Sequence, residues 1–174
     1  MHRGNLFLVG MPGSGKSTLG RLLAKRLGKA FYDADSELER RLGVSIPVIF
    51  ELEGEAGFRD REQEVIAEYV THTRTIFATG GGAVLREVNR VCLKQNGTVL
   101  YLHATPETLW ERTRRGKHRP LLQGPDPFQR LQELYAARDA LYRQTADFVV
   151  ESDQEQVIRL AQRLEQQLRA AEQA

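Results

Sequence analysis

The segment with the clearest chemical potential is Gly10–Ser17, which has the pattern G-x-x-x-x-G-K-[ST]. It follows a short apolar run at residues 5–9 and precedes a run of helix-forming residues, so we expect it to join a strand to a helix. Glycines let such a loop fold tightly with its N–H groups pointing inward, and the following helix adds the positive end of its dipole. The pattern therefore predicts a loop that binds phosphate groups of a nucleotide.

Two side chains at the end of this loop have distinct expected roles. Lys16 should reach the β- and γ-phosphates, and Ser17 should offer its hydroxyl to Mg²⁺. A glycine turn that matches the pattern by chance is disfavoured by the strand before it and the helix after it. The use of the nucleotide is still open at this point, because the phosphoryl group can go to water, to a conformational switch or to another small molecule.

Motifs typical of two other nucleotide-binding classes are missing from the sequence. A GTPase would normally carry Asn-Lys-x-Asp, and no asparagine in this chain is followed by lysine. An ATPase motor usually has an apolar strand that ends in an acid, and the apolar segments at residues 75–82 (TIFATGGG) and 98–104 (TVLYLHA) lack one. These absences favour a small kinase.

Two aspartates, Asp33 and Asp35, end the expected strand at residues 29–35. In an extended segment, side chains two residues apart face the same way. One carboxylate could hold Mg²⁺ through its water shell while the other orients an acceptor hydroxyl and takes its proton. A purely structural alternative, in which Asp35 only caps the next helix, is equally compatible with the spacing.

Glycines and isolated arginines supply further candidates. Gly80–Gly82 follow a buried strand, and three consecutive glycines are conformationally expensive, which favours close approach of the backbone to a ligand over a merely flexible connection. Arg59 could bind a carboxylate with its planar fork, although a surface ion pair with Glu62 is the more common fate of such a side chain. Arg138 presents the same two alternatives.

A run of cations opens a segment rich in glycine and proline at residues 116–127. It can be a solvated surface, or a mobile loop that carries positive charge over a triphosphate and excludes water during transfer. The cations are Arg112, Arg114, Arg115, Lys117 and Arg119.

Composition sets the broad class of the protein. With 174 residues, 41% hydrophobic and 28% charged, the chain is long enough for one domain with a real core. The net charge of only +2 does not argue for nucleic-acid binding. The lone Cys92, the short apolar run near the N-terminus and the lack of a membrane-length apolar segment lead us to expect a soluble, cytoplasmic protein. The histidines show no metal-ligand spacing, so zinc is not expected.

Expected strands alternate with expected helices along the whole chain. The strands are predicted at residues 5–9, 29–35, 75–79, 98–104 and 147–150, with a continuous helix over 83–97 and a broken one over 44–70, interrupted near Gly54. This alternation is typical of an α/β protein whose parallel sheet is covered on both faces. Ligands bind such sheets beyond the carboxyl ends of the strands, so the loops after the first three strands should lie at one edge.

Taken together, these motifs resemble those of the shikimate kinases. The resemblance runs from Asn5 to about Asp153 and rests on the order and spacing of GMPGSGKST, FYDAD, IFELEGEAGFRDRE, ATGGG, RPLL and YAARDALYRQTAD. It implies a three-layer P-loop NTPase fold of the nucleoside monophosphate kinase type, with a five-stranded parallel sheet in order 2-3-1-4-5. It also implies a single kinase domain over 1–174, with a substrate-binding region at about 33–61 and a lid at about 113–124.

The resemblance further implies transfer of the ATP γ-phosphate to the 3-hydroxyl of shikimate, with Lys16, Asp35 and Arg119 in catalytic roles. Asp33 would support the Mg²⁺ bound by Ser17, and Asp35 would be the candidate base. The implied ATP-binding residues are Gly13, Ser14, Gly15, Lys16, Ser17, Thr18, Arg112 and Arg119. The implied shikimate-binding residues are Asp35, Arg59, Gly80, Gly81, Gly82 and Arg138.

Two departures from the family pattern are minor: Met11-Pro12 within the phosphate loop, and Ala34 between the aspartates, where the family often has serine. The expected ligands are ATP, Mg²⁺ and shikimate, with no nucleic acid or membrane, and a monomer is the family-level expectation. Two alternatives remain: another small-molecule kinase of this architecture, such as a gluconate kinase, and a nucleotide-binding regulatory module that has lost catalysis.

Overall fold

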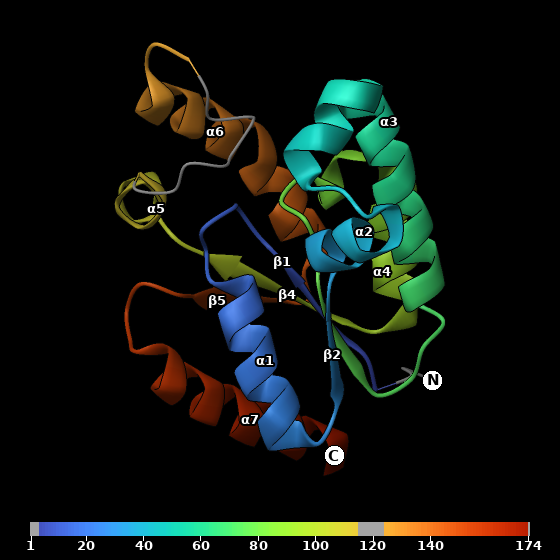
Figure 1. Cartoon of the computed structure of the whole chain (residues 1–174). Helices are drawn as coiled ribbons and strands as arrows, with labels where there is room; N and C mark the ends of the chain where they lie inside the picture. The colour runs from blue at the N-terminus through green and yellow to red at the C-terminus, as the bar shows by residue number, and fades with distance from the viewer. Residues whose placement is uncertain (1–3, 115–123, 174) are drawn as a thin grey trace.

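A five-stranded, all-parallel sheet in the order β2-β3-β1-β4-β5 forms the centre of the molecule (Figure 1). The computed structural model describes residues 4–114 and 124–173. The strands are β1 (Leu6–Val9), β2 (Ala30–Asp33), β3 (Thr75–Ala78), β4 (Thr98–His103) and β5 (Phe148–Glu151). The order predicted through the family resemblance is therefore confirmed.

Alternation along β1 shows why the sheet is covered on both faces. Leu6 and Leu8 belong to one apolar cluster, while Phe7 and Val9 belong to another, as expected when successive side chains point to opposite faces. Two helices cover the face with Leu6 and Leu8: α1 (Lys16–Leu27) and α7 (Val157–Gln173), which lie side by side in Figure 1. The apolar stripe of α7, from Val157 to Leu168, packs into this cluster.

The helices that form the functional region lie mainly over the other face. They enclose the larger apolar cluster, which includes Phe58, Leu93, Leu131 and Tyr142. These elements are α2 (Ala34–Leu42), α3 (Ile46–Tyr69), the 3₁₀ turn η1 (Ala83–Leu85), α4 (Glu87–Asn96), α5 (Pro106–Thr113) and α6 (Pro127–Thr145). The described residues include no helix long and apolar enough to cross a bilayer.

Local backbone geometry confirms one predicted break and corrects one predicted helix. Gly54 has φ 69° and ψ −178°, which kinks α3 near the predicted position. The continuous helix predicted over 83–97 is wrong at its beginning, because Arg86 is extended with φ −94° and ψ 128°. A 3₁₀ turn closed by the Leu85 N–H and the Gly82 carbonyl comes first, and it ends the glycine segment before α4 begins.

Candidate active site

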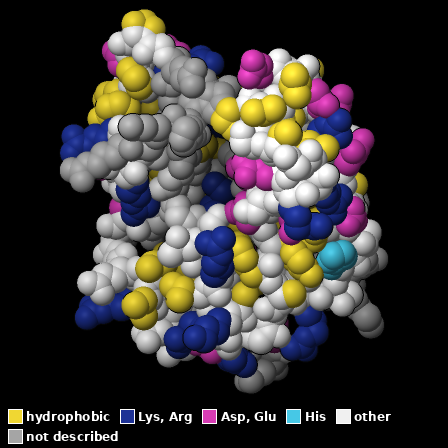
Figure 2. Space-filling model, in the orientation of Figure 1, with side chains coloured by type: hydrophobic (Ala, Val, Ile, Leu, Met, Phe, Trp, Pro, Cys, Tyr) yellow, Lys and Arg dark blue, Asp and Glu magenta, His cyan; other side chains and the backbone are white. Residues whose placement is uncertain are grey.

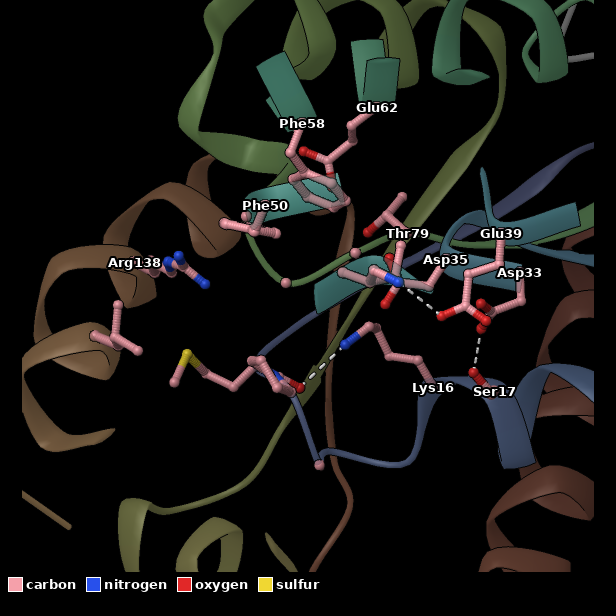
Figure 3. Close-up of a pocket in the computed structure, with 18 of the residues that line it drawn as sticks. Lys16, Ser17, Asp33, Asp35, Glu39, Phe50, Phe58, Glu62, Thr79 and Arg138 are labelled. Carbon is pink, nitrogen blue, oxygen red and sulfur yellow. Dashed lines mark hydrogen bonds between the residues drawn. The ribbon is translucent and has the colours of Figure 1, made fainter. Parts of the chain in front are cut away.

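A cleft of about 690 Å³ lies beyond the carboxyl ends of β1, β2 and β3. The loops that follow these strands all line it, together with α3 and α6, as the expected sheet edge predicts (Figure 3). In the space-filling view the molecule is hollowed between α2 and α6, and both acidic and basic side chains lie at the edge of the hollow (Figure 2). The predicted phosphate and acceptor residues thus share one cavity.

The phosphate loop, residues 10–18, owes its shape to glycines. Gly10, Gly13 and Gly15 have φ of 151°, 83° and 96°, a region that side chains rarely adopt. At Gly10 a Cβ would also lie 2.5 Å from the carbonyl oxygen of Leu102 on β4. Backbone and neighbouring strand therefore both exclude larger residues at this position.

Lys16 lies folded across the phosphate loop. Its Nζ donates to the carbonyl oxygens of Gly10 at 2.7 Å and Met11 at 3.0 Å, and the side chain is buried. The neighbouring Ser14 Oγ is buried and has no hydrogen-bond partner among the described residues. The predicted phosphate loop thus contains a positive charge that lines the cleft and a buried hydroxyl without a partner among the described residues.

Asp33 binds both to the phosphate loop and to the start of α2. Its Oδ2 accepts a hydrogen bond from the Ser17 hydroxyl, and its Oδ1 accepts one from the Ser36 N–H at 3.0 Å. The structural alternative that Asp35 caps this helix is therefore wrong, because Asp33 is the capping residue. An oxygen pair from Ser17 and Asp33 is a donor set suited to Mg²⁺.

Asp35 faces the cleft instead of capping the helix. Its carboxyl is open to solvent inside the cleft, but the surrounding walls displace much of the bulk water. This desolvation, together with the negative charges of Asp33 and Glu62, raises the pKa of Asp35 to about 6, while Lys16 acts in the opposite direction. A carboxyl group with such a pKa is suited to exchange a proton near neutral pH.

Arg59 forms an ion pair with Glu62, but the pair is buried and not at the surface. Arg59 Nη1 lies 2.9 Å from Glu62 Oε1, and the two residues are 7% and 0% exposed. Burial raises the pKa of Glu62, although the adjacent Arg59 opposes the shift. A Cβ on Gly82 would overlap the Arg59 guanidinium, so the bare backbone of the glycine loop, residues 80–82, packs directly on this pair.

Arg138 projects from α6 into the cleft (Figure 3). It is 2% exposed, and its Nη1 has no hydrogen-bond partner among the described residues. A buried cation with an unused donor is costly unless a ligand completes it. This observation favours the binding alternative for Arg138 over the surface ion pair.

Sequence reasoning missed two groups of cleft residues. Glu62 entered only as a surface partner of Arg59, and its i,i+3 spacing on one helix was the available signal. The apolar wall had no signal that separates it from ordinary core, and Phe50 and Phe58 form its centre with ring centroids 4.6 Å apart. The other apolar residues that line the cleft include Met11, Ile46, Pro47, Leu131 and Leu134.

Arg112 connects the phosphate loop to the segment after β5. Its guanidinium donates to the carbonyl oxygens of Ser14 at 3.2 Å and Ser152 at 3.0 Å. The nearby Gly13 packs so closely that a Cβ would overlap the Thr113 methyl group at the end of α5. Arg119 and most of the predicted lid lie outside the described residues.

A phosphate loop on a parallel sheet of this order, opening into a cleft whose other walls are acidic, basic and apolar, defines a P-loop kinase of small molecules. A family model described as shikimate kinase matches residues 12–169. Two curated shikimate kinases, from Nitrosospira multiformis and Burkholderia lata, are 58% and 54% identical to the chain. These matches cover 95% and 96% of the chain and 85% and 91% of the relatives.

Solved structures agree with this result. "Shikimate kinase from Acinetobacter baumannii in complex with shikimate" matches with a TM-score of 0.92 and 46% identity, covering 96% of this chain and 93% of that one. The chain belongs to the shikimate kinase family, and it is a shikimate kinase by activity. A gluconokinase from Sinorhizobium meliloti, at 18% identity and a TM-score of 0.54, shares the fold alone.

Proposed function

We propose that the cleft is where this chain transfers the γ-phosphate of ATP to the 3-hydroxyl of shikimate. ATP, the phosphate donor, binds on the phosphate loop, and shikimate binds on the opposite wall. The proposal is carried by one juxtaposition. A phosphate loop, a carboxylate with a raised pKa and a buried arginine with an unused donor all open into a single cavity. Shikimate has a carboxylate at one end and hydroxyls on its ring, which matches this distribution of charge.

On the donor side, Gly13, Ser14, Gly15 and Thr18 bind the ATP phosphates through the loop backbone and hydroxyl groups. Lys16 exchanges its hydrogen bonds to the Gly10 and Met11 carbonyls for bonds to the phosphates. The buried, unpartnered Ser14 hydroxyl supports this assignment, because a bound phosphate would satisfy it. Arg112 lies along the adenine, next to its present contacts with Ser14 and Ser152.

The oxygen pair of Ser17 and Asp33 fits Mg²⁺, which when bound would neutralise charge on the phosphates. Ser17 would contribute its hydroxyl, and Asp33 would support the ion through water. The hydrogen bond that joins the two side chains is consistent with this role, since it places both oxygens on the same side of the loop.

On the acceptor side, Asp35 orients the attacking hydroxyl and takes up its proton, while Arg59 and Arg138 bind the carboxylate. Gly80–Gly82 contribute backbone contacts. The transition state of such transfers is loose, so positioning and charge neutralisation supply most of the rate. Arg119, on the lid at about 113–124, would add positive charge and exclude water, and the chain would act as a cytoplasmic monomer.

An ADP-release assay with ATP and Mg²⁺ tests the proposal against both alternatives. Shikimate should support rapid ADP release, whereas gluconate and nucleoside monophosphates should not exceed the rate without an acceptor. Faster release with gluconate would overturn the acceptor assignment. No release with any acceptor would favour a nucleotide-binding module without catalysis.

Omission of the metal tests the Ser17–Asp33 assignment in the same assay. Excess EDTA should abolish release, and Mg²⁺ should restore it. Ser17→Ala should raise the KM for ATP with Mg²⁺ but leave shikimate affinity nearly unchanged. Equal loss of affinity for both substrates would argue against a local metal role.

A further inference from the structure

The glycine loop, residues 80–82, uses its backbone carbonyls and N–H groups in opposite ways. The carbonyl oxygens of Gly80 and Gly82 each accept a hydrogen bond at 3.1 Å from the backbone N–H three residues further along. The Gly81 carbonyl oxygen accepts one from the Tyr142 hydroxyl at 2.5 Å. None of the three N–H groups donates to another described residue. The carbonyl groups are therefore all bonded within the protein, while the N–H groups of this loop, which lines the cleft, have no partner among the described residues.

Tyr142 is well placed to fix this arrangement. It lies on α6, one turn after Arg138, and its side chain is fully buried. Its ring packs against Tyr101 of β4 with a centroid distance of 4.9 Å, so the hydroxyl has little freedom to leave the Gly81 carbonyl. Tyr101 of the sheet thus supports Tyr142, whose hydroxyl binds the glycine loop.

Gly81 itself lies between the donor and acceptor sides of the cleft. A Cβ at this position would be 2.7 Å from Pro12 Cδ in the phosphate loop and 3.4 Å from Arg138 Nη1. Because glycine has no side chain to hold its backbone, its peptide groups rotate easily unless an outside group binds them. In a trans peptide the C=O and the next N–H point in opposite directions, so fixing the Gly81 carbonyl also fixes the Gly82 N–H.

We infer that Tyr142 is a positioning residue for the acceptor: by holding the Gly81 carbonyl it presents the N–H groups of the glycine loop beside Arg138, as one binding surface for a carboxylate. The inference rests on the proposed function, and it adds a residue that touches neither substrate. Its hydroxyl acts through the Gly81–Gly82 peptide, since a carboxylate needs several donors in fixed directions to be bound tightly.

Tyr142→Phe removes only the hydroxyl, and Tyr101→Phe is its matched control. Tyr101 is also fully buried and belongs to the same ring pair, but its hydroxyl donates to Asp139 at 2.8 Å and not to the glycine loop. Tyr142→Phe should raise the KM for shikimate about tenfold while the KM for ATP stays within about twofold. Tyr101→Phe should lower thermal stability comparably and change neither KM by more than about twofold.

The inference would be overturned if the KM of Tyr142→Phe for shikimate stayed within about twofold of that of the unaltered chain. It would also be overturned if Tyr142→Phe and Tyr101→Phe raised the KM for shikimate equally. Arg138→Ala, measured alongside, separates this failure from that of the proposed function. If Arg138→Ala weakens shikimate binding and Tyr142→Phe does not, only the positioning role is wrong. If neither does, the acceptor assignment fails as well.

A measurement on the unaltered chain covers the case in which Tyr142→Phe does not fold. In ¹⁵N-labelled protein, titration with shikimate should move amide proton resonances of residues 80–82 downfield, as expected when N–H groups bind a carboxylate. Absence of a downfield shift at all three glycines under saturating shikimate would overturn the inference.

Discussion

The two halves of the cleft are built in different ways. The donor half is one continuous segment, residues 10–18, whose proposed contacts with phosphate come mainly from the backbone. The acceptor half combines Asp35 from α2, Arg59 and Glu62 from α3, the glycine loop after β3, and Arg138 from α6. A backbone site depends on local conformation, whereas a site made of distant side chains depends on the packing of the whole helical layer.

Hydrogen bonding separates the halves in the same way. In the donor half Lys16 donates to the Gly10 and Met11 carbonyls, so its charge has polar partners without a ligand, and the buried group that lacks a hydrogen-bond partner among the described residues is the neutral Ser14 hydroxyl. In the acceptor half, Arg59 Nε, Glu62 Oε2 and Arg138 Nη1 are buried without hydrogen-bond partners among the described residues. Each unsatisfied buried group costs about 1–3 kcal/mol. The unsatisfied groups of the acceptor half therefore lower the free energy of unfolding, and a bound carboxylic acid that supplies hydrogen-bond partners can restore it.

The largest expected effect lies where the two halves meet, at Asp35. Asp35→Asn keeps the shape of the side chain but cannot accept the proton, so turnover should fall by about 10²–10⁴-fold. Glu37→Gln is the matched control, because Glu37 lies on the same helix but binds Arg40 and Tyr69 and does not line the cleft. Steady-state kinetics at saturating substrates check this. An Asn variant with near-normal turnover would rule out the base and orienting roles.

A smaller and more selective effect is expected within the acceptor half. Arg138→Ala should raise the KM for shikimate by about 100-fold, since loss of a buried charged hydrogen bond to a ligand typically costs 2–5 kcal/mol. The KM for ATP should change little. Arg143→Ala, on the same helix, removes an arginine that pairs with Asp139 at 2.9 Å and should affect neither constant. Equal rises in both KM values would show that the halves are not independent.

Local features of the fold could be predicted from the sequence alone. The phosphate loop, the kink at Gly54 and the alternation of strands and helices each depend on a few adjacent residues, and all are confirmed. The strand order came from the family resemblance, because spacing does not determine which strands are neighbours. The first part of the helix predicted over 83–97 failed because the turn after the glycine loop and the extended Arg86 depend on contacts that periodicity does not register.

The acceptor half could be predicted only in part. Spacing left Asp33 and Asp35 ambiguous, and the hydrogen bond from the Ser36 N–H decides which of them caps the helix. Arg59 and Glu62 were correctly paired, but their burial follows from the glycine loop lying across them, far away in sequence. Tyr142 had no sequence signal that separates it from ordinary core: its ring packs against Tyr101, and its hydroxyl contact with Gly81 is seen only in the structure.

The smallest expected effect concerns the stability of the metal-free and nucleotide-free protein. The pKa of Asp35 is raised from 3.8 to about 6 by desolvation and by the neighbouring Asp33 and Glu62. Between these pH values the unfolded chain has lost the proton while the folded one keeps it, so stability falls as the pH rises. Above about pH 6 the loss of unfolding free energy caused by the ionised Asp35 is constant. Asp35→Asn, which cannot ionise, should not show this loss.

Thermal unfolding in EDTA, at intervals from about pH 4 to pH 8, measures this penalty. Because the carboxyl is open to solvent in the cleft, we expect screening to reduce the difference to about 1 kcal/mol, or about 2–4 °C in Tm at pH 8. The difference should shrink as the pH falls from 6 toward 4, because the folded protein then keeps the proton while the unfolded chain approaches its ordinary pKa of 3.8. An Asn variant that is less stable at pH 8, or a gap independent of pH, would contradict the assigned cause. The acceptor half would then owe its unsatisfied charge to Arg59, Glu62 and Arg138 alone.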